Sequence, residues 1–145
     1  MELTRGFLPH FRANGGGGII NINFGISSFT LPLGVVYCAT KHALDAFTES
    51  LTYELSPQNI FIKSIVPFCT ITSTKFSDTS NQLAAEKVDS SLLSVYGSFL
   101  QKIGGIYGNM TTWPGVLGDD VSQVVYTAAT DGTDRLCYLL GPNQE

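Results

Sequence analysis

The first half of the chain contains two short apolar runs separated by one long helical pattern. Residues 19–23 form the first run, directly after four consecutive glycines, and residues 60–66 form the second, directly before Pro67. Apolar runs of this length that are bounded by Gly and Pro are typical of buried strands. Between them, residues 37–56 have apolar side chains at steps of three and four, which predicts an amphipathic helix that ends at Pro57. Strand, helix and strand with short connections indicate a right-handed crossover and a parallel sheet.

The rest of the chain carries weaker patterns. Residues 2–14 look like the end of a helix that Pro9 interrupts, and residues 83–104 have helical periodicity. Two aspartates, residues 119–120, precede another helical stretch, where we expect an N-cap and a first-turn acid. Residues 136–140 are predicted to form a final short strand. Together these elements predict an α/β fold.

Composition and charge exclude several classes of function. The 145 residues fit one domain, and 43% hydrophobic against 14% charged residues suit parallel strands covered by helices on both faces. The net charge of −4, without a basic cluster, argues against nucleic-acid binding. No apolar stretch approaches the roughly 20 residues that span a bilayer, and the start of the chain lacks the pattern of a signal peptide. We therefore expect a cytoplasmic protein without a membrane partner.

The cysteines and histidines predict neither a disulfide nor a metal centre. Cys38, Cys69 and Cys137 are an odd number with no close pair, as expected in a reducing compartment. His10 and His42 have no further ligand at a metal-binding spacing, so we expect no metal. We interpret Cys38 as a small packing residue.

The candidate chemistry lies at the head of the long helical stretch, in Tyr37 and Lys41. Four residues are about one helical turn, so the phenol and the ammonium group should share a face. A phenol has a pKa of about 10, and a neighbouring cation lowers this pKa by favouring the ionised form. The pair is therefore a credible acid–base unit, although one such short motif alone is a weak signal.

Together with its flanking segments, this motif resembles the short-chain dehydrogenase/reductase family, in the second half of its Rossmann-like domain. The matching segments are residues 3–11, 18–22, 37–41, 46–51, 121–126 and 129–136. The resemblance implies a three-layer α/β domain with a parallel sheet of about three strands and flanking helices, whose N-terminal βαβ half is missing. A single truncated domain would occupy residues 1–145, with residues 83–117 resembling the lid over the substrate pocket.

The resemblance also implies a reaction, a cofactor and a partner. The reaction would be hydride transfer between NAD(P) and a small carbonyl or alcohol, with Tyr37 as proton donor or acceptor. Lys41 would lower the pKa of the tyrosine and hold the ribose hydroxyls of the nicotinamide. Two copies of the chain would pair through the Tyr37 helix, with Leu44, Phe47 and Leu51 or their neighbours at the contact.

One departure from the family pattern lies beside the tyrosine. The serine that polarises the substrate carbonyl in this family lies thirteen residues before the tyrosine, and that position is Phe24. Phenylalanine has no hydrogen-bond donor, and the loss of one such donor can cost about 3 kcal/mol in activation barrier. A locally shifted loop would present Ser27 or Ser28 instead; otherwise both are ordinary loop serines.

A second departure follows the second strand. There the family has Pro-Gly and then a threonine that grips the nicotinamide, whereas Pro67 is followed by Phe68. Thr72 is the best positional match for this threonine, with Thr70 and Thr74 as competitors. Pro67, Thr70 and Thr72 join Tyr37 and Lys41 as candidate cofactor-binding residues.

The third departure concerns the cofactor phosphates. The glycine cluster at residues 15–18 precedes a strand, whereas a dinucleotide-binding turn follows one and opens a helix. Two functions stay open on these observations. The chain is either the catalytic and substrate half of an NAD(P)-dependent oxidoreductase, or a catalytically inactive remnant that serves as a dimerisation or interaction module. We expect the isolated chain to be inactive.

Overall fold

A parallel three-stranded sheet forms the centre of the protein. The computed structural model describes residues 1–68, 74–76, 78–80, 82, 90–110 and 115–141. The strands are β1 (Gly17–Ile22), β2 (Ile60–Pro67) and β3 (Cys137–Leu140), and they lie in the order β1-β2-β3. All pairs are parallel, with Ile22 opposite Ile65 and Ser64 opposite Cys137. The predicted α/β fold with a parallel sheet is confirmed.

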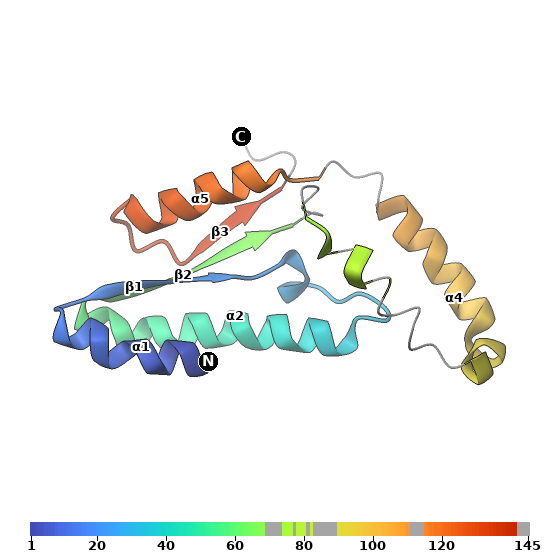
Figure 1. Cartoon of the computed structure of the whole chain (residues 1–145), viewed down its shortest axis with the longest axis horizontal. Helices are drawn as coiled ribbons and strands as arrows, with labels where there is room; N and C mark the ends of the chain where they lie inside the picture. The colour runs from blue at the N-terminus through green and yellow to red at the C-terminus, as the bar shows by residue number, and fades with distance from the viewer. Residues whose placement is uncertain (69–73, 77, 81, 83–89, 111–114, 142–145) are drawn as a thin grey trace.

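Helices cover both faces of this sheet (Figure 1). The helices α1 (Glu2–Ala13) and α2 (Val35–Leu55) lie on one face, and α5 (Gly118–Thr130) lies on the other. A fourth helix, α4 (Ser90–Met110), extends away from one end of the sheet. Two short 3-10 turns, η1 (Gly25–Ser27) and η2 (Ser56–Gln58), flank α2 in the sequence.

Two helix boundaries differ from those predicted. Pro9 lies inside α1 and does not end it, although proline lacks an amide donor and its ring crowds the preceding turn. The last helix has Leu117 rather than Asp119 as its N-cap. Asp120 lies in the first turn, where its Oδ2 accepts a hydrogen bond from the Leu117 amide at 3.2 Å. The carboxylate therefore reaches back to the cap from within the helix, where it also complements the helix dipole.

The core has one layer on each face of the sheet. The buried cluster beneath α5 consists of Ile65, Val116, Ala128, Tyr138 and Leu140. On the α2 side, the buried side chains include Leu55, Ile62, Val66 and Thr48. Because β2 is covered on both faces, all of its residues from Ile62 onward are buried, which explains why it reads as a continuous apolar run.

One residue of that run is charged. Lys63 is only 3% exposed, and its ammonium group donates to Asp131 Oδ1 at 2.7 Å, to the Ala128 carbonyl at 2.9 Å and to Tyr138 Oη at 3.2 Å. The Tyr138 hydroxyl in turn donates to the second oxygen of Asp131. Since the Ala128 carbonyl belongs to the last turn of α5, this network ties that helix end to the sheet.

Charge pairing governs the ionisation of this network. Burial lowers the pKa of Lys63, but the hydrogen bonds with Asp131 and Tyr138 outweigh burial and leave this pKa raised. The hydrogen bond from Lys63, followed by that from Tyr138, holds the pKa of Asp131 well below its usual range. Both groups are therefore charged at neutral pH.

Lys63→Met should destabilise the fold by about 2 kcal/mol, because Asp131 and the Ala128 carbonyl lose a donor that water replaces poorly. The midpoint of urea unfolding measures this change. Lys102→Met, at an exposed position on α4, is the matched control and should leave the midpoint unchanged. Equal midpoints for the two variants would contradict a structural role for the buried lysine.

The same network predicts a pH dependence with a defined sign. Because the pKa of Asp131 is lower in the folded chain than in the unfolded chain, its stabilisation is complete above about pH 5. This stabilisation is lost as the pH falls through about 4 and below. Asp131→Asn should therefore be less stable than the unaltered chain at pH 7, and the difference between their urea midpoints should shrink toward pH 3. A difference that stays constant with pH would refute the linkage.

Candidate active site

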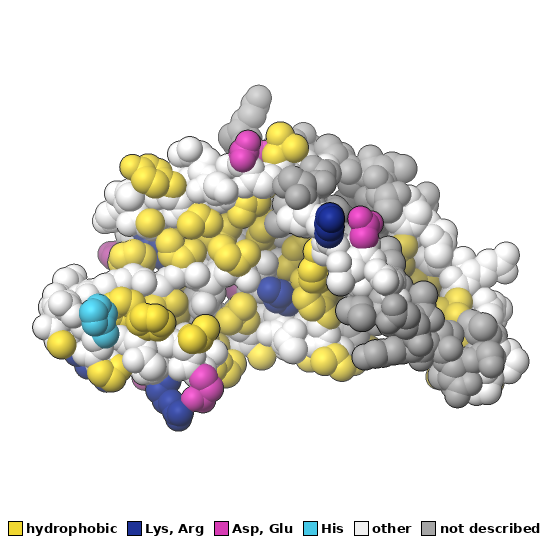
Figure 2. Space-filling model, in the orientation of Figure 1, with side chains coloured by type: hydrophobic (Ala, Val, Ile, Leu, Met, Phe, Trp, Pro, Cys, Tyr) yellow, Lys and Arg dark blue, Asp and Glu magenta, His cyan; other side chains and the backbone are white. Residues whose placement is uncertain are grey.

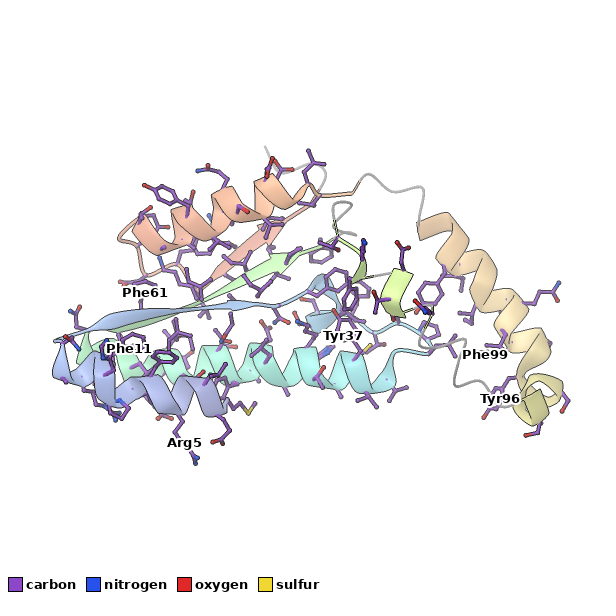
Figure 3. All side chains as sticks on the ribbon, in the orientation of Figure 1. Arg5, Phe11, Tyr37, Phe61, Tyr96 and Phe99 are labelled. Carbon is purple, nitrogen blue, oxygen red and sulfur yellow. The ribbon has the colours of Figure 1, made fainter. Side chains whose placement is uncertain are left out.

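The candidate site lies where β1 and β2 end and α2 begins (Figure 3). After β1 the chain turns through η1 and enters α2 at Val35, which places Tyr37 in the first turn of that helix. The carboxyl ends of parallel strands are where open α/β sheets bind their ligands. The predicted acid–base residues therefore lie at the functional end of the sheet.

A polar seam fixes α2 against β1 and so positions these residues. Three hydrogen bonds form this α2–β1 seam: Lys41 Nζ to the Ile22 carbonyl (3.1 Å), Asn23 Nδ2 to Asp45 Oδ1 (3.0 Å) and Asn21 Nδ2 to Thr48 Oγ1 (2.9 Å). The three α2 residues recur at steps of three and four, so one face of the helix carries all of them. Tyr37 continues the same face, one turn before Lys41.

Tyr37 and Lys41 lie together, as their spacing predicts. The Lys41 ammonium is 5.8 Å from the centroid of the Tyr37 ring. Tyr37 is half-buried, and within the described residues its hydroxyl has no hydrogen-bond partner. The phenol is therefore free to bind a ligand oxygen.

The expectation that Lys41 lowers the pKa of Tyr37 is wrong for this structure. Burial, with a smaller contribution from Cys38, raises the pKa of the phenol above its ordinary value. Burial also lowers the pKa of Lys41, whose ammonium group is directed to the Ile22 carbonyl. A phenol with a raised pKa is protonated at neutral pH, so Tyr37 is suited to donate a proton rather than to accept one.

Aromatic rings surround the phenol. Phe24 lies 6.2 Å and Phe76 lies 6.0 Å from the Tyr37 ring, between centroids. A second pair, Phe29 and Phe68, lies at 5.9 Å. We call these five residues the aromatic cluster. Phe24 thus occupies the neighbourhood of the hydroxyl without offering a hydrogen-bond donor.

The two candidate serines differ in their surroundings. Ser27, in η1, is 7% exposed, and its hydroxyl has no hydrogen-bond partner among the described residues. Ser28 is exposed at the end of the same turn. Within the described residues, neither serine is hydrogen-bonded to Tyr37.

The end of β2 is closed by a phenylalanine. Pro67 is buried, and the Phe68 amide donates to the Leu140 carbonyl at 2.6 Å. Phe68 packs so closely on Gly25 that a Cβ there would lie 3.1 Å from the Phe68 Cα and Cγ atoms. Thr70 and Thr72 lie outside the described residues.

These groups fit only one end of a dinucleotide. Tyr37 and Lys41 offer a hydroxyl and an ammonium group that could contact a ribose. The space above Gly25, however, is filled by Phe68, so this turn is no open cradle for a phosphate. Tyr37 and Lys41 could therefore hold a ribose, whereas the turn at Gly25 leaves no room for a phosphate.

A separate cleft lies along another face of α2. It has a volume of about 700 Å³ and is lined by Thr30, Leu31, Pro32, Val35, Cys38, Ala39 and His42. Cys38 is buried, in agreement with its interpretation as a packing residue. Tyr107 of α4 donates to the Pro32 carbonyl at 2.7 Å, a long-range contact that carries no signal in the sequence.

Other kinds of site find no support in the described ranges. Among the described residues, no group of three His, Cys, Asp or Glu side chains is placed to hold a metal ion. No helix within these described residues is long and apolar enough to cross a membrane.

Comparison with known proteins identifies the family. The family pattern for short chain dehydrogenase matches residues 1–83, which include α1, β1, α2 and β2. The chain belongs to the short-chain dehydrogenase family. This short-chain dehydrogenase sequence is 30% identical, over 97% of its length, to an uncharacterised oxidoreductase of Schizosaccharomyces pombe. It covers 56% of that relative, and so spans about half the length of the curated relatives it matches.

Solved structures agree on the fold. A short-chain dehydrogenase from Streptomyces avermitilis aligns with 96% of this chain at a TM-score of 0.69 and 21% identity, and the match covers 47% of that structure. L-sorbose reductase from Gluconobacter frateurii, complexed with NADPH and L-sorbose, aligns with 96% of the chain at a TM-score of 0.65 and 23% identity; 51% of that structure is covered. At these identities the likeness establishes the fold of this short-chain dehydrogenase chain.

The Tyr37 phenol should titrate above its ordinary pKa of about 10, because burial disfavours the phenolate. The difference in ultraviolet absorbance between the unaltered chain and Tyr37→Phe, followed against pH, isolates this phenol among the six tyrosines. Tyr53→Phe, exposed on the same helix, controls for the loss of one tyrosine. A Tyr37 midpoint below pH 8 would show that the cation dominates after all.

Proposed function

We propose that this chain is the proton-donating and substrate-binding part of an NAD(P)-dependent oxidoreductase that interconverts small carbonyl compounds and alcohols. The observation that carries the proposal is the placement of Tyr37 and Lys41 on one face of α2, at the carboxyl end of β1. Membership of the short-chain dehydrogenase family supports the same reaction class. The NADPH in the L-sorbose reductase complex supports the choice of cofactor class.

In the proposed reaction Tyr37 acts as the general acid. The dinucleotide, when bound, supplies the hydride that forms the new C–H bond. Tyr37 gives its hydroxyl proton to the substrate oxygen, which completes the alcohol and leaves a phenolate. Lys41, 5.8 Å from the ring centroid, stabilises that phenolate by its charge and offsets part of the cost of burial. General-acid catalysis of this kind contributes about 10²- to 10⁴-fold to rate.

Phe24 limits the rate that this site can reach. Phe24 offers no donor to the developing negative charge on the substrate oxygen, so among the candidate residues of the described chain we assign this role to the Tyr37 hydroxyl. A missing donor of this kind costs about 10²-fold in turnover. We also expect weak dinucleotide binding by the chain on its own, since the described residues fit only the ribose end.

A second candidate function is a non-catalytic interaction module that pairs with another copy through α1 and α2. Leu44, Phe47 and Leu51, the side chains first expected at this contact, are half-buried within the chain. The exposed apolar side chains on the two helices are instead Leu3, Phe7, Val35 and Val36. Figure 2 also shows hydrophobic side chains gathered over the sheet between α1 and α5. Such exposed apolar surface favours association, so we propose a homo-oligomer in either function.

Fluorescence titration with NADH and NADPH separates the two candidate functions. Saturable binding at micromolar concentration would support the oxidoreductase. No binding up to millimolar concentration would contradict that function for the chain by itself and favour the interaction module. The cytoplasmic location stays a prediction.

Tyr37→Phe should lower any carbonyl reduction that the chain shows by about 10²- to 10⁴-fold, because the proton donor is lost. NADPH consumption with a small ketone, measured beside the binding titration, provides the test. Tyr53→Phe on the exposed face of α2 should keep the original rate. Unchanged turnover in Tyr37→Phe would remove the phenol from the mechanism.

A further inference from the structure

Two rings of the aromatic cluster face solvent. Phe76 is 63% exposed although its ring pairs with Tyr37 at 6.0 Å, and Phe68 is 38% exposed although it pairs with Phe29. The separations of these pairs lie in the range in which aromatic rings attract one another. A phenylalanine that served only the core would be covered, whereas these rings leave apolar surface open beside a hydroxyl with no described partner.

The two groups of rings both lie near the η1 turn, and together we call them the wall. Phe24 is the N-cap of η1 and is followed directly by Gly25. Phe68 packs closely on Gly25, since a Cβ added to this glycine would lie 3.1 Å from the Phe68 Cα atom. The Phe24–Tyr37–Phe76 group therefore adjoins the Phe29–Phe68 pair at this turn. Residues from three regions of the chain thus bring their rings to the same end of the sheet.

Among the described residues, the charged groups nearest Tyr37 on α2 are engaged in hydrogen bonds. The Lys41 ammonium group is engaged by the Ile22 carbonyl, and Asp45, one turn further along α2, accepts from Asn23. The Tyr37 hydroxyl is the one donor of the aromatic cluster and has no partner in the described part of the chain. A ligand with several hydroxyls would leave most of them unpaired here, which disfavours polyols.

We propose that the Tyr37 site takes a carbonyl compound or alcohol that carries an aromatic ring next to the reacting carbon. Its oxygen accepts a hydrogen bond from Tyr37, and its ring stacks against the cluster, with Phe76 as the residue that determines specificity. This substrate class rests on the proposed function, because it assigns the reacting oxygen to the Tyr37 hydroxyl.

The test compares two ketones of similar size, acetophenone and cyclohexyl methyl ketone, in equilibrium binding to the whole chain without dinucleotide. Ligand-detected NMR gives both dissociation constants. We expect acetophenone to bind about 2- to 10-fold more tightly, which is the range that an aromatic pair contributes beyond its buried area. Phe76→Leu keeps an apolar side chain without a ring and should bring the ratio of the two constants close to one.

Two variants control this measurement. Phe99→Leu removes an exposed ring on α4, which lies away from Tyr37 in Figure 3, and should leave the ratio unchanged. Tyr37→Phe keeps the ring and removes the hydroxyl, so it should weaken both ketones by a similar factor and preserve the ratio. Phe24→Leu is a second variant within the wall and should also reduce the ratio.

Equal binding of the two ketones, no binding of either at several millimolar, or an unchanged ratio in both Phe76→Leu and Phe24→Leu would overturn the substrate class. These outcomes are separate from failure of the proposed function, because no dinucleotide is present. Selective acetophenone binding without any NADH or NADPH binding up to millimolar concentration would contradict the oxidoreductase for the chain by itself and keep the aromatic site. Turnover with equal kcat/KM for both ketones would keep the oxidoreductase and refute the aromatic class.

Discussion

The α2–β1 seam is the constraint on which the candidate site depends. The apolar face of α2 alone would tolerate a shift of one turn along the sheet, because its leucine and phenylalanine side chains are similar in size. A shift would separate the Asn21 and Asn23 side chains, which are partly or fully buried, from their partners at a desolvation penalty, and it would break the contact of Lys41 with the Ile22 carbonyl. The observed register makes all three hydrogen bonds, and it places Tyr37 at the carboxyl end of β1.

The surroundings of Tyr37 combine this polar seam on one side with the aromatic cluster on the other. Phe24, which has no hydrogen-bond donor, helps to make this site apolar. Burial raises the pKa of the phenol and keeps its proton in place at neutral pH. Phe24 and Phe68 thus leave the carboxyl ends of β1 and β2 apolar.

A buried, hydrogen-bonded charge stabilises the opposite face of the sheet. Lys63 is buried within a strand, and such a charge is tolerated only where its hydrogen bonds are satisfied. Asp131, Tyr138 and the last turn of α5 satisfy them, and in doing so they secure the helix that completes the core. The two faces of the sheet thus have separate anchors.

The sequence by itself determined the features that depend on local periodicity. The two strands, the long helix up to Pro57, their parallel arrangement and the shared face of Tyr37 and Lys41 all follow from the spacing of side chains, and the α/β fold is predictable on that basis. Only the tertiary structure decided the direction of the Tyr37 pKa shift, the approach of Phe76 to that ring and the partners of Lys63. Desolvation and long-range contacts depend on which segments lie together in the folded chain. The local spacing of residues along the sequence does not predict which segments these are.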